Sequence, residues 1–60
     1  MKLTITINCD GAAFEEIPML EAARILRKVV DALPAVAPPS ALILRDINGN
    51  VCGQVTVTKE

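Results

Sequence analysis

Residues 42–57 read LILRDINGNVCGQVTV, and this stretch decides the fold. Asn48-Gly49 lies between two runs of aliphatic and β-branched residues, each long enough to form a strand. A two-residue type I′ turn needs positive φ at both central positions, and Asn followed by Gly tolerates that best. We therefore expect a hairpin with strands at 42–46 and 51–58.

In this hairpin Leu42 lies opposite Val55 and Leu44 lies opposite Gly53, which keeps the apolar residues of both strands on one face. Side chains alternate along a strand, so Cys52 is expected to point away from the core. The residues of the last strand expected on the core face are Val51, Gly53, Val55 and Val57.

Residues 2–8 alternate apolar and polar with period two and are predicted to form a strand with one buried face. The opposite face of the sheet is expected to be polar and threonine-rich.

Residues 12–17 fit either a short helical turn or an ordered loop that places Phe14 on the core. Pro18 suits the first turn of a helix.

Residues 19–33 carry apolar side chains at helical spacing and are predicted to form an amphipathic helix ended by Pro34. Glu21 with Arg24, and Arg27 with Asp31, are expected to pair on its solvent-facing side. Residues 34–40 are rich in Pro and predict an extended connection back to the sheet. The apolar stripe of the helix consists of Met19, Ala22, Ala23, Ile25, Leu26, Val29, Val30 and Leu33.

The predicted order of elements is βαββ, in the α+β class. A right-handed crossover places the third strand between the other two as a split βαβ unit, so the sheet order 1-3-2 is favoured over 1-2-3. One helix covers one face of this sheet. The whole chain, residues 1–60, is expected to form a single small domain.

The core of this domain is expected to be thin. Apolar residues make up 52% of the chain, but Phe14 is its one aromatic residue. Domains of about 60 residues are marginally stable and often need a disulfide, a metal or a second subunit. The stripe on the helix is wider than one small sheet needs, and the outer strands offer free edges. The sequence therefore predicts a homodimer, through the helix face, a sheet edge or both.

The two cysteines, Cys9 and Cys52, do not favour a disulfide, because the strand alternation places them on opposite faces. A catalytic thiol is also disfavoured, since the chain contains no histidine to act as its base.

Other catalytic and metal-binding arrangements are equally poorly supported. Asp46 has no second carboxylate fixed opposite it and is expected to hydrogen-bond into the hairpin turn instead. The glycines are too scattered for a phosphate-binding loop. An oxygen-rich group around the first loop lacks the spacing of a calcium loop and fits a turn and a helix N-terminus better; it consists of Asn8, Asp10, Glu15 and Glu16. We expect no enzyme activity, no cofactor and no metal.

A net charge of −1 gives the chain no basic excess for binding a nucleic-acid backbone. Arg24, Arg27 and Lys28 form a basic stripe on the predicted helix, and they are the candidate partner-binding residues for a protein target. The alternative is a nucleic-acid-binding accessory role that also uses Lys2.

The N-terminal segment has the pattern of neither a signal peptide nor a membrane span, so a cytoplasmic location is expected.

Three segments of the chain resemble a group of short, uncharacterised proteins encoded in bacterial prophages and related mobile elements. The segments are residues 8–15 (NCDGAAFE), 23–27 (ARILR) and 44–53 (LRDINGNVCG). The resemblance spans most of the chain, and under the hypothesis that it supports, the expected partner is a host or phage protein. It implies no activity and no site residues. The leading hypothesis from sequence is a non-enzymatic protein-interaction module of mobile-element type.

Overall fold

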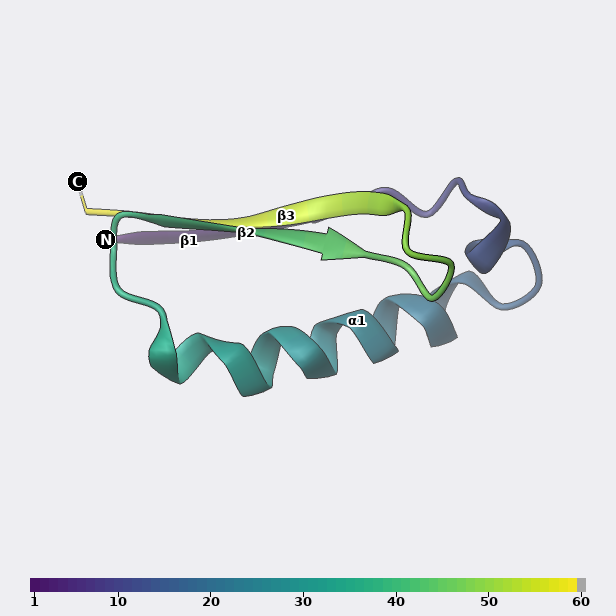
Figure 1. Cartoon of the computed structure of the whole chain (residues 1–60), viewed down its shortest axis with the longest axis horizontal. Coiled ribbons are helices and arrows are strands. Elements are labelled where there is room, and N and C mark those ends of the chain that lie inside the picture. The colour runs from purple at the N-terminus through teal and green to yellow at the C-terminus, as the bar shows by residue number, and fades with distance from the viewer. Residues whose placement is uncertain (60) are drawn as a thin grey trace.

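A computed structural model describes residues 1–59 and has the expected βαββ order, with α1 covering one face of a three-stranded sheet (Figure 1). The elements are β1 (Lys2–Ile7), the 3-10 turn η1 (Ala12–Phe14), α1 (Pro18–Ala32), the 3-10 turn η2 (Leu33–Ala35), β2 (Ser40–Arg45) and β3 (Val51–Thr58). The α+β class predicted from the sequence is confirmed.

The sheet has the order β1-β3-β2, and β3 runs antiparallel to both neighbours. Leu42 pairs with Val55 and Leu44 pairs with Gly53, as the hairpin pattern predicts. The favoured order 1-3-2 is confirmed. It arises because the connection through α1 returns the chain parallel to β1 but two strand positions away, which leaves the central position to β3.

The hairpin loop is not the type I′ turn expected from Asn48-Gly49. Gly49 has a φ of 83°, but no non-glycine residue among residues 1–59 has a positive φ. The Gly49 N–H donates to the Asp46 carbonyl at 2.9 Å, and the Asp46 N–H donates to the Asn50 carbonyl at 2.9 Å. This pattern belongs to a three-residue loop that ends in a left-handed glycine. The Asp46 carboxylate stabilises it by accepting the N–H groups of Asn48 and Asn50, at 2.9 and 3.0 Å.

A β-bulge between β2 and β3 overturns the predicted orientation of Cys52. Leu44 pairs with Gly53 but Arg45 pairs with Val51, so Cys52 is an extra residue on β3. The bulge turns Cys52 into the core, where it is 7% exposed, and leaves Val51 59% exposed. Both expectations for these side chains were therefore wrong. The two cysteines are free thiols.

Gly53 allows β1 and β3 to approach closely beside this bulge. A Cβ atom at Gly53 would overlap the carbonyl oxygen of Thr6 and would lie 3.0 Å from the Cα atom of Ile7. Because both obstacles are backbone atoms, they have little freedom to move. Position 53 therefore has to be glycine for a steric reason, since its φ is not in the left-handed region.

The core lies between α1 and the sheet, with Phe14 closing one end. Of the two alternatives for residues 12–17, the structure has the short helical turn, over Ala12–Phe14, and it places Phe14 in the core at 2% exposure. The buried core cluster consists of Phe14, Ile25, Val29, Leu44, Cys52 and Val55.

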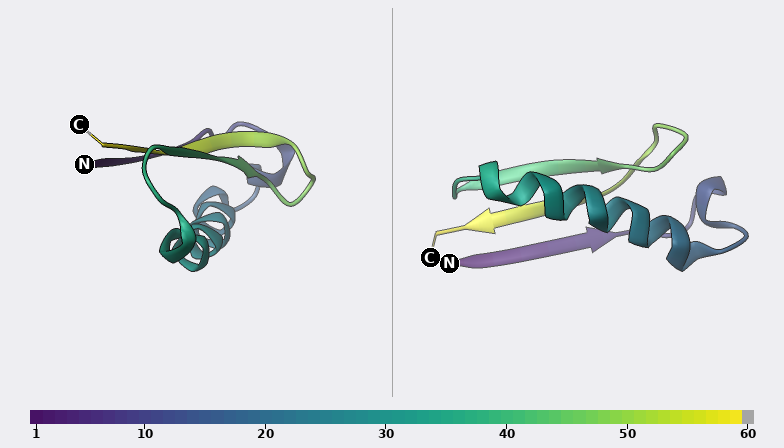
Figure 2. Two further views of the ribbon diagram at one scale, coloured as in Figure 1. Left: turned by 60° about the vertical axis from the view of Figure 1, so that its left-hand side comes forward. Right: turned by 90° about the horizontal axis from the view of Figure 1, so that it is seen from below.

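The apolar stripe of α1 is only partly buried. Ala22, Ile25 and Val29 face the sheet, while Met19, Leu26, Val30 and the non-stripe residue Leu20 are exposed. Figure 2 shows the reason, because α1 crosses the sheet obliquely, with its C-terminal end over β2 and its N-terminal end toward the far end of β1. Three strands are too narrow to cover the whole stripe.

The Pro-rich connection begins with η2 rather than as a fully extended segment. Pro34 occupies the first turn of η2, where its missing N–H costs no hydrogen bond. The chain then extends from Val36 to the sheet, and the Pro38–Pro39 peptide bond is cis.

Candidate functional site

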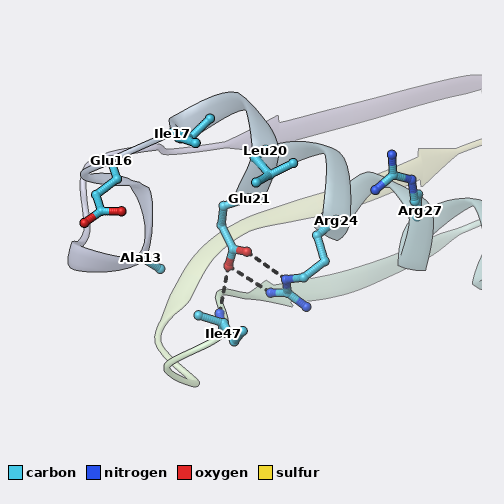
Figure 3. Close-up of a pocket in the computed structure, with 8 residues that line it drawn as sticks. All are labelled: Ala13, Glu16, Ile17, Leu20, Glu21, Arg24, Arg27 and Ile47. Atoms are coloured by element: carbon cyan, nitrogen blue, oxygen red, sulfur yellow. Dashed lines mark hydrogen bonds and ion pairs between the residues drawn. The ribbon is translucent and has the colours of Figure 1, made fainter.

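An open concave surface lies where the N-terminal half of α1 meets η1 and the hairpin loop (Figure 3). It has a volume of about 500 Å³. We call it the α1–hairpin groove. Its lining residues are Ala13, Glu16, Ile17, Leu20, Glu21, Arg24, Arg27 and Ile47.

Glu21 occupies the centre of this groove and joins two of its walls. One carboxylate oxygen, Oε1, accepts the Nε–H of Arg24 at 2.7 Å. The other, Oε2, accepts Nη2–H of Arg24 at 2.9 Å and the backbone N–H of Ile47 at 2.8 Å. The Glu21–Arg24 pair predicted from the sequence is confirmed, but Glu21 is 8% exposed and does not lie on the solvent-facing side.

These contacts hold the pKa of Glu21 low. Hydrogen bonding to Arg24 is the main cause, and the Ile47 N–H adds to it, while burial acts in the opposite direction. Together these effects lower the pKa of Glu21 from 4.5 to about 2. The same hydrogen bonds raise the pKa of Arg24. At neutral pH the pair is therefore fully ionised and bidentate, a geometry that fixes both side chains.

Apolar side chains form the rims of the groove. Ile17 and Leu20 come from the start of α1, and Ile47 faces them from the hairpin loop, each more than 60% exposed. Figure 3 shows Glu16 at one end of the groove and Arg27 toward the other. Since Glu21 and Arg24 neutralise each other at the centre, the groove presents apolar rims with a negative end at Glu16 and a positive end at Arg27.

The three candidate partner-binding residues do not share one surface. Arg24 and Arg27 line the α1–hairpin groove, whereas Lys28 lines a separate groove of about 330 Å³ between α1 and β2. Arg24 uses two of its five donors on Glu21. Arg27 makes no hydrogen bond or ion pair within residues 1–59, so its expected pair with Asp31 is absent from the described chain.

Asp46 has the structural role that the sequence predicts. Its carboxylate accepts two N–H groups of the loop, and the side chain is 6% exposed, so it is committed to the turn. Across residues 1–59, no three Asp, Glu, Cys or His side chains come together as metal ligands.

Sequence reasoning did not find the importance of Ile47 and Leu20, or the burial of Glu21. The i,i+3 spacing of Glu21 and Arg24 indicates their pairing, but no sequence signal shows that a helix carboxylate meets a loop N–H 26 residues later. The sequence offers one signal for Ile47 and Leu20: each is a large aliphatic residue that lies outside the faces predicted to be apolar.

No helix in the described part of the chain is long and apolar enough to span a membrane. Comparison with protein-family models, with curated proteins and with solved structures finds no match.

Proposed function

We propose that this protein is a non-enzymatic protein-interaction module that binds a segment of a partner protein in the α1–hairpin groove. One observation supports this proposal above the others. Ile17, Leu20 and Ile47 are large, exposed and apolar, and they gather around a single groove. Exposed apolar side chains that cluster in this way mark interaction surfaces more often than scattered ones do.

The charges at the two ends of the groove specify the segment that fits. An apolar side chain of the partner would lie between Leu20 and Ile47. A basic residue on one side of it would meet Glu16, and an acidic residue on the other side would meet Arg27. The groove would therefore bind such a segment in one direction.

The reactive groups of the chain support a binding role over catalysis. There is no histidine. The carboxylates of Glu21 and Asp46 are held by Arg24 and by loop N–H groups, and burial raises the pKa of the Cys52 thiol. None of these three groups is placed to act as a nucleophile or base on a molecule in the groove.

The proposal also covers the location, oligomeric state, origin and partner of the protein. The protein acts in the cytoplasm as a homodimer, it derives from a prophage or related mobile element, and its partner is a host or phage protein. The thin core supports the homodimer, and the resemblance of three sequence segments supports the origin.

Photo-crosslinking in host cells tests the proposal. A photoreactive residue at Leu20 or at Ile47 is expected to capture the same protein, and one at Gln54, on the opposite face of the sheet, is expected not to capture it. The captured protein is then purified and its affinity measured. Leu20→Lys should weaken binding at least tenfold, whereas Ile43→Lys, which adds the same charge on the polar face, should leave it unchanged.

Two outcomes would overturn the proposal. In one, Leu20 and Gln54 capture the same proteins; in the other, Leu20→Lys binds as tightly as the wild type. Retention on DNA that falls steeply with salt and decreases in Arg27→Gln would favour the alternative nucleic-acid role. The structure offers that role no single basic face, because Lys2 lies on the sheet face away from α1 and Lys28 lies outside the groove.

A further inference from the structure

β1 is an edge strand with an unprotected outer side. Five of its six residues are exposed, and it contains no proline and no bulge. The Asn8 N–H donates to the Cys52 carbonyl at 2.7 Å, so the backbone groups of even-numbered residues point toward β3. Backbone groups alternate in direction along a strand, and those of Leu3, Ile5 and Ile7 therefore point away from β3. They form a template for another strand.

An apolar surface lies beside this edge, on the face of the sheet that carries α1. Lys28 and Ala32 line the groove toward β2, so Leu26 and Val30, about half a turn away around the helix, lie on the flank toward β1. Leu3 and Ile5 project from β1 on the same face as Val55 and Val57. We call this surface the β1 apolar face; it consists of Leu3, Ile5, Met19, Leu26 and Val30, all of them exposed.

Charge distinguishes this edge from the outer edge of β2. Lys28 and Arg45 both line the groove between α1 and β2, so two copies joined there would bring four cations together. The β1 apolar face contains no charged side chain. Like charges placed opposite one another destabilise strand pairing, so self-association is favoured at β1.

The surface area of the chain is also larger than a compact monomer needs. The chain exposes 4255 Å², whereas a folded monomer of 6.4 kDa exposes about 3,800 Å². The molecule is elongated, with extents of 38 × 18 × 17 Å. A stable interface covers about 800 Å² on each partner, and burying part of the exposed surface in such an interface would bring the area of each copy toward that of a compact monomer.

We propose that the occupant of this surface is a second copy of the chain, joined through antiparallel pairing of β1 with β1 about a two-fold axis at Ile5. This proposal rests on the homodimer proposed above and names the surface that forms it. The two sheets become one sheet of six strands, with both copies of α1 on the same face. The two β1 apolar faces then meet across the axis, over the paired strands.

The alternation of backbone groups requires odd-numbered residues to pair with one another, and an axis at Ile5 is the register that pairs all three outward-pointing residues of β1. With Ile5 opposite Ile5 of the partner subunit, Leu3 lies opposite Ile7 of the partner subunit, and all three outward-pointing residues form hydrogen-bonded pairs. Thr4 lies opposite Thr6 of the partner subunit on the polar face. A shift by one residue would place outward N–H groups opposite residues whose backbone groups point the other way.

Sedimentation equilibrium with matched variants tests the surface. The wild type is expected to be a dimer at micromolar concentration. Val30→Lys should weaken the dimer at least tenfold, while Ile43→Lys should not, although the two wild-type side chains are similarly exposed at 64% and 58%. Ile5→Pro removes an outward N–H and no bond to β3, so it should give a monomer that retains its far-ultraviolet circular dichroism.

Disulfide trapping tests the register. In a Cys9→Ser background, Ile5→Cys should form an intermolecular disulfide on oxidation, because two-fold related hydrogen-bonded residues have Cα atoms about 5.5 Å apart. Thr4→Cys should not form this disulfide, because Thr4 lies opposite Thr6 of the partner subunit and therefore two residues away from the partner subunit's Thr4. Efficient crosslinking by Thr4→Cys alone would overturn the register.

The outcomes separate this proposal from the others. A monomer with a concentration-independent melting temperature would overturn the dimer and its surface together. A dimer that persists in both Val30→Lys and Ile5→Pro would overturn the β1 surface and leave the homodimer. Neither result depends on partner capture in the α1–hairpin groove.

Discussion

Oε2 of Glu21 accepts the backbone N–H of Ile47 at 2.8 Å, although the two residues are 26 positions apart. This bond connects the hairpin loop to the first turn of α1. It also orients Arg24, which shares the same oxygen through Nη2. The shape of the α1–hairpin groove therefore depends on one largely buried carboxylate.

Acid should weaken the fold through Glu21. The pKa of this carboxyl is lowered from 4.5 to about 2 in the folded protein, so the unfolded chain takes up a proton at a higher pH than the folded one. The stabilisation is complete above pH 4.5 and is lost as the pH falls to about 2. Urea unfolding at several pH values should show a steeper loss for the wild type than for Glu21→Gln over this range.

Glu16→Gln provides the control for that measurement, because Glu16 lines the same groove and makes no hydrogen bond within residues 1–59. Its pH profile should follow the wild type. Parallel profiles for the wild type and Glu21→Gln would contradict the role of the Glu21 contacts.

Replacing Gly53 should damage the sheet. In Gly53→Ala, the new Cβ atom would overlap the Thr6 carbonyl oxygen, and β1 would have to move away from β3. We expect a loss of at least about 2 kcal/mol in the free energy of unfolding. Gly11→Ala is the matched control, because its Cβ atom would lie 3.5 Å from an oxygen of Asp46, an ordinary contact. Equal stability of the two variants in denaturant melts would refute the steric argument.

Replacing Gly49 should act through the backbone alone. No atom lies within 4 Å of a Cβ at this position, but its φ of 83° strains an L-residue. Gly49→Val should reduce stability by about 1–3 kcal/mol. Gly49→Asn should cost less, because Asn tolerates the left-handed region better. A thermal melt in which valine and asparagine behave alike would show that the loop changes conformation to accommodate them.

The two thiols should differ in reactivity. Cys52 is buried beside Leu44, whose carbonyl oxygen lies 3.6 Å from its Sγ atom, and burial raises its pKa. Cys9 is only partly buried. Brief alkylation with iodoacetamide, followed by mass spectrometry of peptides, should therefore modify Cys9 first and Cys52 only under unfolding conditions. Early labelling of Cys52 would show that the bulge does not hold it in the core.

The sequence by itself determined the order of elements and most of the hairpin register, and it favoured the strand order without deciding it. Those features follow from local patterns, because the alternation in residues 2–8 and 51–58 and the spacing along residues 18–32 each favour one secondary structure. The partner of Asp46 was also predictable, since an Asp two residues before Asn48 can reach the loop N–H groups without help from the rest of the fold.

Only the tertiary structure decided the loop type, the orientation of Cys52 and the position of Glu21. The bulge at Cys52 depends on how β2, β3 and β1 fit together around Gly53, which no single strand pattern encodes. Glu21 is buried because the oblique path of α1 brings it to the Ile47 N–H, a contact between segments distant in sequence. The same oblique path leaves Leu26 and Val30 exposed, because a sheet of three strands is narrower than the apolar face of the helix that packs on it.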